Sequence, residues 1–183
     1  MFRRRSFLKS SSLIAGGLIL PKLSFKSKKL NQKKLKIAVV GCGGRGTGAA
    51  VQALRADNNV ELVTLADAFK DRLETSLNAI KDEFEGEMEI NIKEKNKFVG
   101  FDAYKKAIDK SDVVILASPP GFRPAHFEYA INKNKHVFME KPVATDAHGV
   151  RQVLNSARKA KEKNLNVVVG LQRRYQKSYL SAK

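Results

Sequence analysis

Cysteine is almost absent from this sequence, and so are the motifs that depend on it. Cys42 is the only cysteine among 183 residues, so no intrachain disulfide can form. It lies between two glycines without a base beside it, and we interpret it as a small filler residue rather than a nucleophile. There is no C-x-x-C or H-E-x-x-H motif, and the three histidines lack the spacing of zinc ligands. We therefore expect no metal site.

A long apolar run is also lacking near the N-terminus. The run at residues 13–20 has eight residues, whereas a transmembrane helix needs about 20, so we expect no integral membrane span. The basic stretch before it, RRSFLK from Arg4 to Lys9, is similar to the twin-arginine export signal R-R-x-F-L-K. A basic tail that contains Arg-Arg by chance is the alternative. We interpret residues 1–34 as a signal peptide followed by a basic linker.

Such a signal implies export of a protein that is already folded. We therefore expect the twin-arginine translocation machinery as a partner. The expected location is the bacterial periplasm or cell envelope.

Acidic residues are missing from the first 36 positions, which hold eleven lysines and arginines. This segment supplies most of the net charge of +17. The other 147 residues carry 24 basic and 18 acidic groups, which is close to balance. Because the excess lies in the leader and linker, the charge does not indicate a nucleic-acid partner.

After the leader, short apolar runs alternate with amphipathic segments. The run VVILA is apolar at every position, as expected for a strand that is buried on both faces of a parallel sheet. The alternation predicts an α/β fold, a doubly wound parallel-sheet Rossmann domain. Strands are expected at 37–40, 60–66, 98–99, 113–117, 136–139 and 167–169, and helices at 47–56, 70–85, 102–110 (capped by Asp102), 124–132 and 146–163.

A glycine-rich segment, GCGGRG at residues 41–46, directly follows the first expected strand and leads into a helix. It fits G-x-G-x-x-G. In that motif the first glycine allows a tight turn, the second lets the backbone approach a pyrophosphate, and the third lets the helix pack closely on the strand. The helix N-terminus then offers N–H groups to the phosphates.

An acidic residue strengthens this interpretation. Asp67 lies 21 residues after Gly46, at the end of the second expected strand. An acid there binds the ribose hydroxyls of NAD and repels the 2′-phosphate of NADP, so NAD is the expected cofactor and NADP is disfavoured. A glycine-rich turn beside a solvated aspartate is the alternative. A cofactor-loaded domain must fold before it is exported, which agrees with the leader.

A lysine follows the strand expected at 136–139. Glu140, Lys141 and Pro142 come where that strand ends, and ligands of open α/β sheets bind at the carboxyl ends of strands. A lysine there can orient a substrate hydroxyl and support proton transfer. From the spacing alone, a solvated surface turn is equally acceptable.

Five segments occur in the order found in the Gfo/Idh/MocA oxidoreductases, and the chain resembles this family over residues 35–176. The segments are VVGCGGRG, ADAF, ASPPGFRPAHFEYAI, KHVFMEKPVA and VVVGLQRRYQ. The resemblance implies an NAD-binding Rossmann domain at 35–176, which is followed in the family by a C-terminal α/β domain. It also implies hydride transfer between nicotinamide and a sugar, inositol or related polyol, and a homo-oligomer at full length.

The resemblance also implies roles for individual residues. Lys141 is implied as the catalytic residue at the nicotinamide. Candidates for substrate contact are His126, Arg173 and Arg174, although His126 is equally suited to packing. The implied cofactor-binding residues are Gly41, Gly43, Gly44, Arg45, Gly46, Asp67, Ser118, Pro119, Arg123, Glu140, Lys141 and Gln172.

One family motif has no match. The D-x-x-x-H of the C-terminal domain is not found, because Asp146 and His148 have a different spacing. We interpret residues 177–183 as the start of the crossover to a missing C-terminal domain, and expect this chain to be inactive alone. Two alternatives stay open: a glycoside hydrolase that uses bound NAD for transient oxidation and elimination, and a non-catalytic nucleotide-binding fragment.

Overall fold

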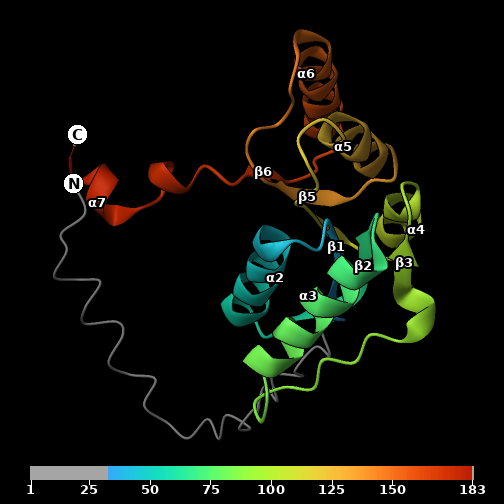
Figure 1. The fold of residues 1–183 in the computed structure, drawn as a ribbon. Helices are drawn as coiled ribbons and strands as arrows, with labels where there is room; N and C mark the ends of the chain where they lie inside the picture. The colour runs from blue at the N-terminus through green and yellow to red at the C-terminus, as the bar shows by residue number, and fades with distance from the viewer. Residues whose placement is uncertain (1–32, 183) are drawn as a thin grey trace, which may run out of the picture. The chain divides into compact units, whose positions relative to one another are not determined.

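The computed structural model describes residues 33–182, which contain a six-stranded sheet (Figure 1). All strand pairs are parallel, and the strand order is β3-β2-β1-β4-β5-β6. This is the doubly wound order of a Rossmann domain, so the predicted fold class is confirmed. The strands are β1 (Leu35–Val40), β2 (Val60–Asp67), β3 (Lys97–Val99), β4 (Val113–Leu116), β5 (His136–Met139) and β6 (Val167–Val169).

Helices cover both faces of the sheet. One apolar cluster joins α2 and α3 to the sheet, and a second cluster joins α4, α5 and α6 to the other face. No helix within residues 33–182 is long and apolar enough to cross a membrane. The helices are α2 (Gly44–Ala56), α3 (Lys70–Glu83), α4 (Ala103–Asp109), α5 (Arg123–Asn132), α6 (Ala147–Glu162) and α7 (Lys177–Leu180), with 3₁₀ turns η1 (Glu94–Asn96) and η2 (Gln172–Arg174).

The central strand β1 shows why its sequence has no polar alternation. Ile37 and Val39 pack in the cluster with α2 and α3, whereas Ala38 and Val40 pack in the cluster with α4 and α5. All four are buried. Burial on both faces therefore requires apolar residues at consecutive positions.

Some element boundaries differ from the sequence expectations. Helix α2 begins at Gly44 rather than Thr47, so the last turn of the glycine segment is already helical. Asp102 stands at the N-cap position of α4 but makes no capping hydrogen bond; its carboxylate lies 2.7 Å from Lys105 Nζ instead. Asp146, in contrast, caps α6 by accepting a hydrogen bond from the Gly149 N–H at 2.8 Å.

The order of the strands creates a switch point between β1 and β4. The chain leaves β1 toward α2 on one face of the sheet and leaves β4 toward α5 on the other. The connections therefore diverge and leave a crevice beyond the carboxyl ends of these two strands. In open α/β sheets this crevice is where ligands bind.

Candidate cofactor-binding cleft

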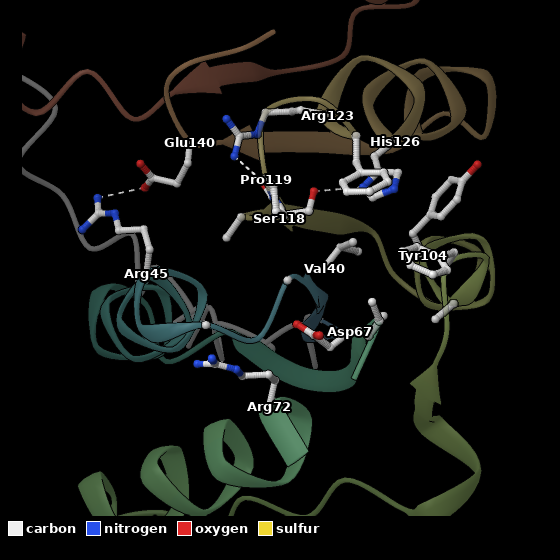
Figure 2. A pocket seen from close by; sticks show the side chains of 18 of the residues that line it. Val40, Arg45, Asp67, Arg72, Tyr104, Ser118, Pro119, Arg123, His126 and Glu140 are labelled. Carbon is white, nitrogen blue, oxygen red and sulfur yellow. Dashed lines mark hydrogen bonds and ion pairs between the residues drawn. The ribbon is translucent and has the colours of Figure 1, made fainter. Parts of the chain in front are cut away.

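A cleft of about 460 Å³ lies at the carboxyl ends of the strands (Figure 2). The segments that follow β1, β2, β3, β4 and β5 all contribute to its walls, so residues far apart in sequence meet there. Its lining includes the following residues named in the sequence analysis: Gly41, Gly43, Arg45, Asp67, Ser118, Pro119, Arg123, His126, Glu140 and Lys141.

The glycine loop, residues 41–46, requires glycine at its first and last positions. Gly41 has a φ of +95°, and a Cβ there would overlap the backbone of Ser118. A Cβ at Gly46 would overlap the carbonyl oxygen of Gly41, where α2 packs against the end of β1. At Gly43, nothing lies within 4 Å of a Cβ position, so the backbone there is open to a ligand. These three environments match the three roles of the motif.

The first turn of α2 is suited to an anion. It contains no acidic residue, and Gly43 at the N-cap provides no side chain that would occupy the free N–H groups. Arg45 lies in this turn and adds a positive charge. The turn therefore combines a helix dipole with a guanidinium beside the cleft.

Asp67 joins the end of β2 to the glycine loop. Its Oδ2 accepts a hydrogen bond from the Cys42 N–H at 2.6 Å, and its Oδ1 accepts one from the Phe69 N–H at 2.9 Å. These bonds hold the carboxylate at the wall of the cleft while leaving it further lone pairs for a ligand.

Cys42 is buried inside the loop. Burial, with a smaller contribution from the negative charge of Asp67, raises the pKa of the Cys42 thiol to about 12. A thiol with so high a pKa is not a nucleophile at neutral pH. The burial of Cys42 agrees with its interpretation as a small filler residue.

The segment after β4 contains a buried polar cluster. The Ser118 hydroxyl lies 3.0 Å from Nδ1 of His126, and the His126 ring stacks on Tyr104 with ring centroids 4.1 Å apart. Burial, and to a lesser degree the charge of Arg123, lowers the pKa of His126 to about 4. His126 is therefore neutral at pH 7, and its contacts are those of a packed residue that also borders the cleft.

Arg123 is 3% exposed and connects two segments of the site. Its guanidinium donates hydrogen bonds to the carbonyl oxygens of Ser118 and Pro142. Burial lowers the pKa of Arg123, and the nearby Glu140 carboxylate partly opposes this change. The arginine predicted to bind cofactor thus ties the end of β4 to the turn that carries Lys141.

Glu140 and Lys141 follow β5 and differ in environment. The Glu140 side chain is buried, and its Oε1 lies 2.8 Å from Nη2 of Arg45 (Figure 2). Lys141 is exposed and lines the cleft. The placement of Lys141 at the carboxyl end of β5 agrees with the position expected from the sequence.

Five predicted site residues are not among those that line this cleft: Gly44 and Gly46, which lie in the first turn of α2, and three residues after β6. Gln172, Arg173 and Arg174 form η2 after β6 and are exposed. Gln172 donates to the Gln176 side chain at 3.4 Å, and the guanidinium of Arg173 lies 5.3 Å from the centroid of the Tyr179 ring. Their predicted contacts with cofactor or substrate stay predictions.

Several cleft residues were not singled out in the sequence. Phe69, Phe101 and Phe122 line the cleft with exposed rings, and Phe101 is 70% exposed. Tyr104 and Arg72 line it as well. Each aromatic residue follows a strand within a few positions, which is the signal that could have found it. Within residues 33–182 there is no cluster of three or more histidine, cysteine or acidic side chains that could hold a metal.

A model of the oxidoreductase family with an NAD-binding Rossmann fold matches residues 35–170. The chain belongs to the Gfo/Idh/MocA oxidoreductase family. This match covers β1 through β6 and all the segments that line the cleft. The family resemblance seen in the sequence is thereby confirmed.

Several proteins similar to this chain are inositol dehydrogenases. Inositol 2-dehydrogenase of Cereibacter sphaeroides is 29% identical over 149 residues, which cover 81% of this chain and 40% of that protein. Two solved structures each match 82% of this chain and 40% of their own. They are apo scyllo-inositol dehydrogenase from Lactobacillus casei (25% identity, TM-score 0.63) and myo-inositol 2-dehydrogenase from Lactobacillus plantarum (27% identity, TM-score 0.62). The chain thus spans about 40% of the length of these relatives.

Proposed function

We propose that this chain is the cofactor-binding part of an NAD-dependent oxidoreductase that acts on an inositol, a sugar or a related polyol. One observation carries the proposal: the glycine loop, Asp67 and Lys141 line the same cleft. Membership of an NAD-binding family and similarity to inositol dehydrogenases support it.

The residues present fit a dinucleotide. The open backbone at Gly43 and the acid-free first turn of α2 suit a pyrophosphate. Asp67 suits the adenosine ribose hydroxyls and disfavours a 2′-phosphate, which is why we propose NAD rather than NADP. Phe101 and Phe122, with ring centroids 6.0 Å apart, offer apolar surface on which an adenine ring can pack.

The part of the cleft at the end of β5 suits the proposed hydride transfer. When bound, the nicotinamide supplies the hydride acceptor or donor. Lys141 is exposed at the end of β5, where its amino group is placed to orient a substrate hydroxyl and to take part in transfer of the hydroxyl proton. Arg123 holds the backbone of this turn through the Pro142 carbonyl.

Calorimetric titration of the 183-residue chain with NAD and with NADP tests the cofactor proposal. We expect NAD to bind at least about tenfold more tightly, since a 2′-phosphate would face the Asp67 carboxylate. Equal affinity for the two nucleotides would contradict the NAD preference, and absence of binding to both would contradict the proposed function.

Oxidoreductase chemistry can be tested in a chimera. Residues 35–176 replace the matching part of the Cereibacter sphaeroides inositol 2-dehydrogenase, and NADH formation is followed with myo-inositol, scyllo-inositol and glucose. We expect inositol-dependent NADH formation, which Lys141→Ala lowers by about 10²–10⁴-fold because a general acid–base group is lost. A chimera that binds NAD but forms no NADH with these polyols contradicts the proposed chemistry.

We also propose export through the twin-arginine route, supported by RRSFLK at residues 4–9. Most of residues 1–34 lie outside the described part of the chain. A reporter fused to residues 1–36 tests the proposal: changing Arg4 and Arg5 to lysine keeps the charge and should stop export. A reporter that is still exported after this change would show that another route is used.

A further inference from the structure

Glu140 is a buried acid with an unusual set of neighbours. It is 4% exposed, and its N–H donates to the Leu116 carbonyl at 3.0 Å, so its backbone is fixed to β4. Its Oε1 lies 2.8 Å from Arg45 Nη2, yet this atom has no well-directed hydrogen bond within the described residues. A buried carboxylate needs a compensating charge. The Arg45 guanidinium supplies it by direct contact, and the nearby Arg123 charge adds to it.

Gly170 provides the space for this carboxylate. Gly170 directly follows β6, and a Cβ there would lie 2.9 Å from both Oε1 and Oε2 of Glu140. The carboxylate therefore rests against a bare stretch of backbone. Gly170 has no positive φ, so the need for glycine comes from Glu140 rather than from backbone conformation.

Within residues 33–182, the Arg45 guanidinium forms an ion pair through Nη2 alone. Its side chain is 54% exposed and lines the cleft beside the glycine loop. A guanidinium has five N–H donors in a fixed plane, so it can contact Glu140 and still present donors to a phosphate. A side chain already held in place loses less entropy when the ligand binds.

We propose that Glu140 is a positioning residue that holds the Arg45 guanidinium beside the phosphate loop, and that Gly170 must be glycine to admit the Glu140 carboxylate. This inference rests on the proposed binding of NAD. The pair links the first turn of α2 to the strand end that carries Lys141 (Figure 2). It therefore fixes the position of the phosphate loop relative to the end of β5, where Lys141 lies.

The variant Gly170→Ala tests this without altering any charge. The added Cβ meets the carboxylate end of the Glu140 side chain rather than backbone, so the carboxylate must shift while the backbone stays in place. We expect the affinity for NAD and for ADP-ribose to fall about tenfold, the loss of one charge-assisted contact to the pyrophosphate. The affinity for adenosine, which has no phosphate, should stay within about twofold of wild type.

The same substitution in an Arg45→Met background completes a double-mutant cycle. Without a guanidinium there is nothing to position, so we expect Gly170→Ala to have no further effect on NAD affinity. Gly48→Ala is the matched control, because nothing lies within 4 Å of a Cβ at Gly48. Glu140→Gln, which keeps the shape of the side chain, gives a second cycle with Arg45→Met that is expected to show the same lack of additivity.

The outcomes separate this inference from the proposed function. If wild type does not bind NAD, the proposed function fails and the inference with it. If wild type binds NAD but the effects in both double-mutant cycles are additive, only the positioning role is overturned. The same holds if Gly170→Ala lowers the affinity for adenosine as much as the affinity for NAD.

Discussion

The side of the cleft beyond β1 and β2 and the side beyond β4 and β5 are held in place by different kinds of contact. Beyond β1 and β2, backbone contacts set the position of the walls: those of the glycine loop at the start of α2, and those of Asp67, which accepts hydrogen bonds from two backbone N–H groups. Beyond β4 and β5, buried side chains fix the wall. Ser118 contacts His126, and Arg123 donates to two carbonyl groups.

This difference separates two ways of making a site rigid. On the glycine side, close contact between backbones sets the shape, so there a single added methyl group is the most damaging change. On the β4–β5 side, desolvated polar side chains set the shape, and their ionisation states make that side sensitive to pH. Four predictions test this contrast, from the largest expected effect to the smallest.

Gly46→Ala is expected to have the largest effect. The added Cβ overlaps the Gly41 carbonyl oxygen and lies 3.3 Å from the Ala117 methyl group, so α2 must move away from β1. We expect the free energy of unfolding to fall by about 3 kcal/mol and NAD affinity to fall by more than about 100-fold, because the phosphate loop is displaced. Urea unfolding and calorimetric titration measure the two losses.

Gly48→Ala, two residues along the same helix, is the control for Gly46→Ala. Its Cβ enters open space, and alanine is favoured over glycine in a helix by up to about 1 kcal/mol. We expect equal or higher stability and unchanged NAD affinity. If Gly46→Ala behaved like this control, close backbone packing would not be what defines the glycine side.

The contrast also explains what could be predicted from the sequence. The glycine side is encoded locally: the spacing from Gly41 to Gly46, followed by Asp67 after the next strand, predicts the loop and favours a dinucleotide as its ligand. The parallel sheet was equally predictable, because strands buried on both faces are apolar at consecutive positions.

The β4–β5 side depends on contacts between distant segments, and the sequence alone does not reveal them. Arg123 contacts Pro142, 19 positions away, and Arg45 contacts Glu140. The cofactor contact that the family resemblance implies for Gln172 stays a prediction, since η2 lies outside the residues that line the cleft. The exposed rings of Phe101 and Phe122 face each other only because the segments after β3 and β4 meet there.

The second prediction concerns pH. Burial lowers the pKa of His126 from 6.5 to about 4 in the folded chain, so between these values the unfolded chain binds a proton that the folded chain does not. The stability that neutral His126 contributes is complete above about pH 6.5 and is lost as the pH falls toward 4. We expect a loss of about 2–3 kcal/mol over this window.

Urea unfolding of wild type and His126→Gln at pH 7 and pH 4.5 measures this loss. Glutamine keeps a polar partner for Ser118 but does not titrate in this range. Lowering the pH from 7 to 4.5 should therefore reduce the free energy of unfolding more in wild type than in the variant. If the free energies of unfolding of the two proteins changed equally with pH, His126 would not be the group that makes the β4–β5 side sensitive to acid.

The third prediction concerns Asp67. Asp67→Ala removes the proposed acceptor for the ribose hydroxyls, and NAD affinity should fall by about 10- to 100-fold, the value of one hydrogen bond to a charged group. The preference for NAD over NADP should narrow at the same time, because the repulsion of a 2′-phosphate is lost. Asp67→Asn separates the two effects, since it removes the charge and keeps an acceptor; its NAD affinity should lie between those of wild type and Asp67→Ala.

The smallest effect on binding is expected for Lys141→Ala. Lys141 is exposed at the end of β5 and makes no hydrogen bond or ion pair within residues 33–182, so its loss leaves the cleft walls intact. NAD affinity in the 183-residue chain should stay within about threefold, under 1 kcal/mol. In the NADH-forming chimera described above, the same change should lower turnover by about 10²–10⁴-fold, because a general acid–base group is lost. A large loss of NAD affinity would instead place Lys141 among the residues that shape the β4–β5 wall, and an unchanged turnover would remove it from the chemistry.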